Sequence, residues 1–390
     1  MKVAKLFLVG AIALGLGLTA CNNETDNFVD KPEATVSVKI VQDANPGTRV
    51  IGDLSVTGAV APDGLAAESA VKKTQVWVFV GNVLDGYGAS TPEKPKEVLD
   101  IAVHTGSRDI YIVVNGPAGL GAATTKTELE AATQSLPISD IATTGLVMTA
   151  NKITKTIVEG KNTIGYGAST ANTTSLQDDP VKVSRINARV AIAEAALDLA
   201  GIAPADLIFD ALTNVQVAMF NVQKTVNIFT GATSGNWMYG QAWPSPNNSY
   251  EKGAGTSETA AAFLEGTITF PITKAAAPYF YVNPMATASK MFIVLRGKPT
   301  LNNNPVTAEG LYTDENGYTY YPVWINQAKT GTTFTGESTG DGVVRRNTQY
   351  NIYLTIKGIG NPYIDPATDA LLDVKVEVEP WKVVDQTVTW

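Results

Sequence analysis

The sequence has almost none of the side chains on which much enzyme chemistry depends. It contains one cysteine, Cys21, and one histidine, His104, among 390 residues. Zinc sites built from histidine and cysteine, disulfide frameworks and paired-cysteine redox motifs all need more such residues, so these three classes are excluded. A nucleophile activated by histidine would depend on His104 alone. This residue lies between a predicted strand and a turn, where a surface histidine is the simpler interpretation.

Charge is also scarce in this chain, and it is mostly negative. Charged residues make up 17% of the sequence, with 29 Lys and Arg against 37 Asp and Glu, for a net charge of −8. A chain of this kind lacks the basic surface with which proteins neutralise nucleic-acid phosphates, so we predict no nucleic-acid partner. Apolar residues reach 44%, which is enough to build sizeable folded cores.

The acidic residues form no recognisable catalytic or metal-binding set. Asp178 and Asp179 are adjacent, and neighbouring residues of an extended chain point to opposite faces, so they serve one site poorly. Residues 314–317 resemble the start of a calcium-binding loop, but no glutamate follows at the required spacing. Asn316 and Gly317 instead predict a type I′ hairpin turn. We therefore expect no enzyme activity, no cofactor and no metal ion.

The first residues are typical of an exported protein. Lys2 and Lys5 precede an apolar run over residues 6–18, which is too short to cross a bilayer comfortably and fits a signal peptide. Small residues then precede Cys21, in a pattern that resembles the lipobox of bacterial lipoproteins. We predict a signal peptide over residues 1–20 and a lipid on Cys21, with a buried free cysteine as the alternative.

The rest of the chain is patterned as short strands. Residues 35–40 alternate so that Val36, Val38 and Ile40 share one face. Thr127 with Glu130 resembles a capping box and predicts one short helix through Leu136. Further strands are predicted at residues 74–80, 110–115, 153–159, 181–192, 291–296, 318–325, 350–357, 374–378 and 383–390. Many short strands separated by Gly, Pro and Asn predict a mostly β fold made of β-sandwiches, with few short helices.

Several short motifs, taken in order, carry a family resemblance. With the lipobox, they make the chain resemble the fimbrillins of Bacteroidales, which are the shaft subunits of type V fimbriae. The resemblance covers most of the chain and is weakest over residues 200–300. The motifs are residues 145–150, residues 160–166, residues 179–183 with Arg185, Ala188 with Arg189, residues 320–323, Arg346 and Asn347 with Tyr350, and Trp381, Gln386, Thr389 and Trp390 near the end.

The resemblance implies a structural protein with two transthyretin-like β-sandwich domains in tandem. Subunits of this family travel as lipoproteins to the outer membrane, are trimmed by an arginine-specific surface protease and polymerise by strand exchange. The filament, with minor tip and anchor subunits, stands at the cell surface and mediates adhesion to host cells and other bacteria and biofilm formation. The implied division is a signal peptide (1–20), a propeptide with the first strand (21–49) and two domains (50–178 and 179–390).

The residues themselves make such processing physically reasonable. Arg49 follows the strand over 35–40 and a polar Pro/Gly loop over 42–48. A cut between Arg49 and Val50 would free that strand and leave an apolar groove with unpaired backbone groups, which can accept another strand.

The strand predicted to fill this groove, the donor strand, is the tail segment, residues 383–390. Its residues Val384, Val388 and Trp390 share one face, with Gln386 between them. The strand over residues 374–378 is the second candidate. Without the resemblance, the simpler interpretation is that the strands at the N-terminal and C-terminal ends complete the subunit's own sheets.

Two other functions fit parts of the sequence. A fimbrial tip or anchor subunit would keep its N-terminus or lack a usable donor. A surface lipoprotein could instead bind glycans through Trp237, Tyr239 and Trp243, although these aromatic residues fit packing over a sheet edge as well. The N-terminal residue of protein sheared from cells separates these cases, because Val50 indicates a polymerising subunit and a blocked Cys21 an anchored lipoprotein.

Overall fold

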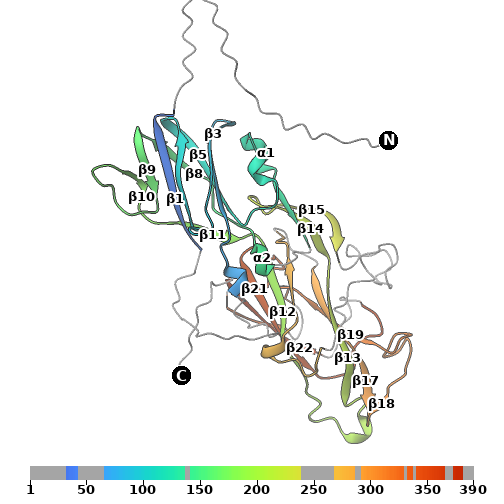
Figure 1. Cartoon of the computed structure of the whole chain (residues 1–390). Helices are drawn as coiled ribbons and strands as arrows, with labels where there is room; N and C mark the ends of the chain where they lie inside the picture. The colour runs from blue at the N-terminus through green and yellow to red at the C-terminus, as the bar shows by residue number, and fades with distance from the viewer. Residues whose placement is uncertain are drawn as a thin grey trace, which may run out of the picture. The chain divides into compact units, whose positions relative to one another are not determined.

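The structure is a computed structural model that describes residues 32–42, 66–136, 141–238, 268–285, 291–328, 332–336, 340–364 and 372–380. These residues form mostly β-structure, as the sequence predicts (Figure 1). Among them, the helices are all short: α1 (Lys126–Glu130), α2 (Ile141–Thr144) and the 3-10 helices η1 (Ala66–Ser69), η2 (Leu120–Ala122), η3 (Pro204–Asp206) and η4 (Lys274–Ala276). No helix in the described ranges is long and apolar enough to cross a membrane.

The first half of the chain builds a ten-stranded sheet around an apolar core. The sheet order is β10-β9-β1-β11-β7-β5-β2-β3, with β4 paired to β1 and β8 paired to β5. The strands are β1 (Ala34–Gln42), β2 (Thr74–Val80), β3 (Val83–Ala89), β4 (Glu97–Val103), β5 (Gly106–Val114), β7 (Met148–Thr149), β8 (Ile153–Ile157), β9 (Gly160–Ile164), β10 (Thr174–Gln177) and β11 (Val181–Arg185). A Cβ at Gly86 of β3 would come within 2.6 Å of the Ala102 carbonyl oxygen, so glycine lets β4 pack closely over β3.

A smaller sheet contains β6 (Thr133–Ser135), β14 (Val222–Asn227) and β15 (Thr233–Met238). The capping box of α1 is formed by Thr125, which accepts a hydrogen bond from the Glu128 N–H, and not by Thr127 as predicted. The predicted helix through Leu136 is also wrong, because α1 ends at Glu130 and residues 133–135 pair with β14 instead.

Two sheets enclose the core of the second half. One has the order β16-β12-β21-β22-β20; the other has the order β13-β17-β18, with β19 paired to β17. The strands are β12 (Ala188–Leu197), β13 (Ala211–Phe220), β16 (Tyr279–Val282), β17 (Phe292–Leu301), β18 (Asn304–Pro305), β19 (Thr319–Trp324), β20 (Thr332–Gly336), β21 (Thr348–Ile356) and β22 (Leu372–Pro380).

The single strand predicted over residues 181–192 is two strands. β11 pairs with β1 and β7 in the first sheet, whereas β12 pairs with β16 and β21. Alternation continues through Ile186 and Asn187, so the sequence pattern carries no sign that the pairing partners change there. The division into two domains remains our proposal, and we now draw its boundary after Arg185 instead of at Asp178 and Asp179.

The type I′ turn predicted at Asn316 and Gly317 is also wrong. Such a turn needs positive φ at both residues, but here only Gly317 has it, at 80°. The Gly317 N–H donates to the Asp314 carbonyl oxygen at 3.0 Å. The Asp314 carboxylate also accepts the N–H groups of Asn316 and Tyr318, both at 2.8 Å. The aspartate side chain therefore fixes a turn over residues 314–317.

Candidate functional site

The candidate site is the place that β1 occupies in the first sheet. β1 pairs with β4 along one edge and with β9 and then β11 along the other. Figure 1 shows β9 beside β1. Residues 34–39 of β1 pair antiparallel with β4, residues 34–38 pair parallel with β9, and residues 40–42 pair parallel with β11. The predicted strand is therefore present, and its backbone is paired along both edges. Removing it would leave a groove with unpaired backbone groups on both walls.

The inward face of β1 is buried in the core. Val36 and Val38 are 0% exposed and Ile40 is 2% exposed. They belong to the same apolar cluster as Val76 of β2 and Ile112 of β5. Burying each such side chain contributes roughly 1.5–3 kcal/mol, so the three together contribute about 5–9 kcal/mol. A vacated groove of this kind would be strongly unfavourable until another strand filled it.

A glycine permits the change of partner along one edge of β1. Gly165 follows β9 with a φ of 89°, and a Cβ there would lie 2.7 Å from the Lys39 carbonyl oxygen and 2.8 Å from Pro180 Cα. β-Carbon atoms do not approach other atoms this closely, and positive φ also favours glycine. Gly165 thus allows β9 to end and β11 to begin beside the same strand.

Gln42 was predicted to begin the loop after the strand, but it ends β1 with its side chain buried. It is 8% exposed, and its Nε2 donates to the Ser69 carbonyl oxygen and lies 3.5 Å from Met148 Sδ. Gln42 continues the alternation of Val36, Val38 and Ile40. That periodicity was the signal by which the sequence could have placed it in the strand.

Two more polar groups contact β1 from the walls of the groove. Ser37 Oγ accepts a hydrogen bond from the Asp100 N–H at 3.0 Å. Asn162, which is 1% exposed, donates from Nδ2 to the Thr35 carbonyl oxygen at 3.3 Å and to the Val158 carbonyl oxygen at 2.7 Å. The sequence analysis missed these residues because their partners lie far away along the chain.

The 3-10 helix η1 anchors the chain next to the end of β1. Its Glu68 is 0% exposed and accepts hydrogen bonds from Arg189 Nη1 at 3.2 Å and from the Tyr281 hydroxyl at 2.5 Å. Arg185 Nε donates to the Glu68 carbonyl oxygen at 2.9 Å, and Arg185 Nη2 donates to Ser69 Oγ at 2.8 Å. The polypeptide is thus fixed to the body of the protein at Glu68, after the segment that contains Arg49.

A charged cluster lies beside the start of β1. Asp85 accepts hydrogen bonds from Arg108 Nε at 2.6 Å and from the His104 N–H at 3.0 Å, and its Oδ1 lies 2.5 Å from His104 Nδ1. The next residue back, Val103, pairs with Ala34 of β1. His104 therefore has the structural surroundings of an ion-pair residue at the end of the groove.

We expect the Asp85 cluster to make stability depend on acid pH. Burial acts to raise the pKa of Asp85, but hydrogen bonds from Arg108 and His104 outweigh it and hold that pKa below its ordinary value. Stability from a depressed carboxyl pKa is fully present above the unfolded pKa of about 3.9 and is lost as the pH falls through the folded pKa. Asp85→Asn should lower the free energy of unfolding at pH 7 by about 1–3 kcal/mol.

Denaturant titrations from pH 7 to pH 3 test this expectation. The difference between wild type and Asp85→Asn should begin to shrink below about pH 4, because the carboxyl of the unfolded chain then binds a proton while the folded one, with its lower pKa, is still charged. Asp179→Asn, at an exposed position, is the control and should change little. A difference that stays constant over the whole range would contradict the role assigned to Asp85.

Hydrogen bonds hold the arginines of the described segments in the fold. The chain has seven, and the six besides Arg49 lie in described segments. Each of the six donates a hydrogen bond: Arg108 to Asp85, Arg185 and Arg189 to Glu68, Arg296 to Gln216, Arg345 to Asp341 and Arg346 to Ser184. Proteases cut extended, mobile chain, so these six are poor targets.

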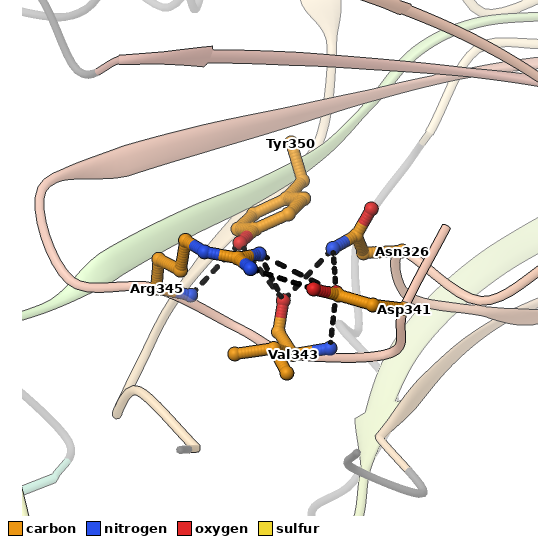
Figure 2. Close-up of polar contacts among 5 residues, drawn as sticks. All are labelled: Asn326, Asp341, Val343, Arg345 and Tyr350. Atoms are coloured by element: carbon orange, nitrogen blue, oxygen red, sulfur yellow. Dashed lines mark hydrogen bonds and ion pairs between the residues drawn. The ribbon is translucent and has the colours of Figure 1, made fainter. Parts of the chain in front are cut away.

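Arg345 is an example of how the fold holds one of these six arginines (Figure 2). Its Nη2 lies 2.6 Å from Asp341 Oδ2, and its backbone N–H donates to the Tyr350 hydroxyl at 2.8 Å. Asn326 Nδ2 donates to Asp341 Oδ1 and to the Val343 carbonyl oxygen, both at 2.9 Å. Burial raises the pKa of Tyr350 to about 12, so its hydroxyl stays protonated and donates to Val343. The backbone around Arg345 is therefore tied down on several sides.

The remaining predicted residues fall into two groups. Asp178 and Asp179 do not form a site, because Asp178 Oδ1 accepts from Ser175 Oγ at 2.6 Å while Gln177 donates to the Asp179 carbonyl oxygen. No cluster of three or more His, Cys, Asp or Glu side chains suited to a metal ion occurs among the described residues. The backbone of Trp237 lies in β15. The other predicted residues lie outside the described residues: Cys21, Arg49, Val50, Tyr239, Trp243, Val384, Gln386, Val388 and Trp390.

Comparisons with known proteins agree with this architecture. Residues 34–185 match the family model "Major fimbrial subunit protein (FimA)". This matched segment begins at the first residue of β1 and ends at the last residue of β11. Residues 299–381 match the model "FimA4 pilin C-terminal domain". The chain is also 28% identical to the major fimbrium subunit FimA type-2 of Porphyromonas gingivalis over 407 residues, covering 100% of both chains.

Solved structures share the fold. A fimbrilin from Porphyromonas gingivalis W83 superposes with a TM-score of 0.69 at 23% identity, covering 91% of this chain and 99% of that one. A putative cell adhesion protein from Parabacteroides distasonis gives a TM-score of 0.60 at 19% identity, covering 89% and 98%. The relatives are structural subunits and not enzymes. The chain therefore belongs to the family of FimA major fimbrial subunits.

Proposed function

We propose that this chain is the shaft subunit of a surface fimbria and that it polymerises by donor-strand exchange. A cut between Arg49 and Val50 would release β1 from its covalent link to the rest of the protein. The tail segment, residues 383–390, of a second copy would then fill the groove. The observation that carries the proposal is the position of β1, which is buried through Val36, Val38 and Ile40 and paired along both edges.

The distribution of arginines supports Arg49 as the target of an arginine-specific protease. The other six arginines are held by hydrogen bonds, and four of them lie within strands. A cut at Arg49 separates β1 from η1, and η1 remains attached to the body through Glu68 and Arg185. The processed subunit would thus keep its fold around the groove.

The pairing of β22 favours the tail segment as donor over the alternative strand. All nine residues of β22 pair with β21, and five of them also pair with β20. Residues 374–378 would have to break both sets of backbone pairs before they could enter another subunit. Residues 383–390 supply Val384, Val388 and Trp390 on one face of an extended strand.

The cellular setting of the proposal follows the family. The precursor would carry lipid on Cys21 and stand on the outer membrane, and the processed copies would form a homopolymer at the cell surface together with minor tip and anchor subunits. Such a filament would bind host or bacterial surface ligands and promote biofilm formation. The lipid leaves with residues 21–49, and the remaining chain has no cysteine, so subunits would be joined without disulfides.

Blocking the cut tests the proposal. Cells producing Arg49→Ala should accumulate a longer precursor and no filaments, because β1 stays in its groove. A fatty-acid label should remain on this precursor and should disappear from it when Cys21→Ser is added. Electron microscopy and N-terminal sequencing of sheared material provide the measurements.

Arg345→Ala is the matched control and should assemble like wild type, with Val50 as the first residue of the filament protein. Normal filaments from the Arg49→Ala variant would contradict the proposal. A label retained after Cys21→Ser would contradict lipid attachment at that residue.

A further inference from the structure

The groove that β1 occupies has one polar position among apolar ones. The inward residues of β1 are Ala34, Val36, Val38, Ile40 and Gln42, and the first four belong to the apolar core. Only Gln42 places a polar side chain inward, and its amide donates to the Ser69 carbonyl oxygen. A strand that replaced β1 would therefore meet hydrocarbon along the groove and a hydrogen-bond acceptor at this end.

This acceptor does not depend on β1 for its position. Ser69 lies in η1, where Arg185 Nη2 donates to Ser69 Oγ at 2.8 Å and Arg185 Nε donates to the Glu68 carbonyl oxygen at 2.9 Å. Glu68 is in turn bound by Arg189 at 3.2 Å. The Ser69 carbonyl group thus stays in place when β1 leaves, and it then lacks the amide that β1 supplied.

We propose that Gln386 of the tail segment replaces Gln42 at Ser69, and that this contact sets the register and direction of the incoming strand. The inference rests on the proposed strand exchange and adds the side-chain match that selects one pairing. Gln386 stands between Val384 and Val388 on the apolar face of the tail segment. At any of the other inward positions of β1 its amide would be buried among apolar side chains without a partner, which is unfavourable.

Placing Gln386 at the position of Gln42 leaves two directions, and side-chain chemistry separates them. A strand running antiparallel to β1 puts Val388 in the place of Ile40 and Trp390 in the place of Val38. A strand running parallel to β1 puts Val384 in the place of Ile40 but Lys382 in the place of Val38, which is 0% exposed. A lysine in that apolar core would be a buried unpaired charge. The tail segment therefore enters antiparallel to β1.

Engineered disulfides can report this pairing in assembled filaments. The outward residue Val41 is 41% exposed and pairs with Lys182 of β11. In the antiparallel arrangement Thr387 takes the place of Val41, whereas in the parallel one Asp385 does. Paired residues in neighbouring strands have Cα atoms about 4.5–5.5 Å apart, within the range a disulfide spans. The processed chain has no cysteine of its own, because Cys21 is removed.

The experiment compares three double variants of the full chain, each cut at Arg49 and allowed to polymerise. Thr387→Cys with Lys182→Cys should give a ladder of covalent oligomers on a non-reducing gel, and Asp385→Cys with Lys182→Cys should give none. A second pair, Thr389→Cys with Glu97→Cys, should also cross-link, because Glu97 pairs with Lys39 of β1 and Thr389 would take the place of Lys39. Adding Gln386→Leu should reduce the Thr387–Lys182 cross-link by at least threefold, since the amide no longer selects the register.

Two results would overturn the inference. A ladder from the Asp385 pair without one from the Thr387 pair would reverse the direction. Filaments in which neither the Thr387 pair nor the Thr389 pair cross-links would refute the register. Failure of the proposed function looks different, because filaments would then form from a chain that lacks residues 383–390.

Discussion

A chain that lacks residues 383–390 should be cut at Arg49 and yet form no filaments. The groove vacated by β1 is lined by apolar residues and has unpaired backbone on both walls, so a subunit without a donor has nothing to place in the next groove. Sedimentation of the cut protein measures the polymer, and circular dichroism checks the fold. We expect the deleted chain to keep its β-sheet spectrum and to stay in the supernatant.

A single charge should have nearly the same effect as the deletion. Val388→Asp places a carboxylate in an apolar groove, where an unpaired charge costs several kcal/mol, so polymer should fall more than tenfold. Thr387→Asp is the matched control, because its side chain lies on the opposite face of the extended strand and should leave assembly near the wild-type level. Filaments from the deleted chain would move the donor role to residues 374–378. Unfolding of that chain would mean that the tail completes the subunit's own sheet.

Glu68→Ala should be among the most destabilising substitutions in the protein. Glu68 is 0% exposed and is bound by Arg189 at 3.2 Å, with Arg185 bonded to its backbone. Burial lowers the pKa of Arg185 to about 10, with Glu68 opposing the shift, so the Arg185 guanidinium remains charged at pH 7. Removing the Glu68 carboxylate would break its buried ion pair with Arg189, and breaking such a pair costs about 3–5 kcal/mol.

Chemical denaturation of the uncut chain measures this loss. Glu159→Ala, at an exposed position, should change the free energy of unfolding by less than about 0.5 kcal/mol. Glu68→Gln should lie between the two, because it keeps the hydrogen-bonding shape and loses the charge. If Glu68→Ala unfolds at the same denaturant concentration as Glu159→Ala, the ion pair does not hold η1 in the fold.

Most strands of this protein could be predicted from short-range periodicity. The alternation of Val36, Val38 and Ile40 gave the strand and its buried face, because a strand repeats every two residues whatever its partners are. The same rule failed at residues 181–192, where alternation continues through a change of sheet. At Gln42 the alternation pointed to the strand, but the polar side chain favoured a loop, although Ser69 binds that side chain inside the fold.

The parts of the site that depend on distant residues could not be predicted. Residues 97–103, 160–164 and 181–183 flank β1, and no local pattern in residues 34–42 names these partners. Glu68 resembles any surface glutamate in sequence, and it becomes an anchor only because folding brings Arg189 and Tyr281 to it.

Local chemistry and folding thus determined different features of this protein. The sequence by itself determined the mostly β class and the buried face of β1, and it predicts an export signal and a cut at Arg49, because each depends on neighbouring residues alone. Only the tertiary structure decided that β1 is paired along both edges, that the other six arginines are held by hydrogen bonds and that Ser69 offers an acceptor at the end of the groove. These features depend on contacts between residues far apart in the chain, and such contacts form only when the whole fold brings their partners together.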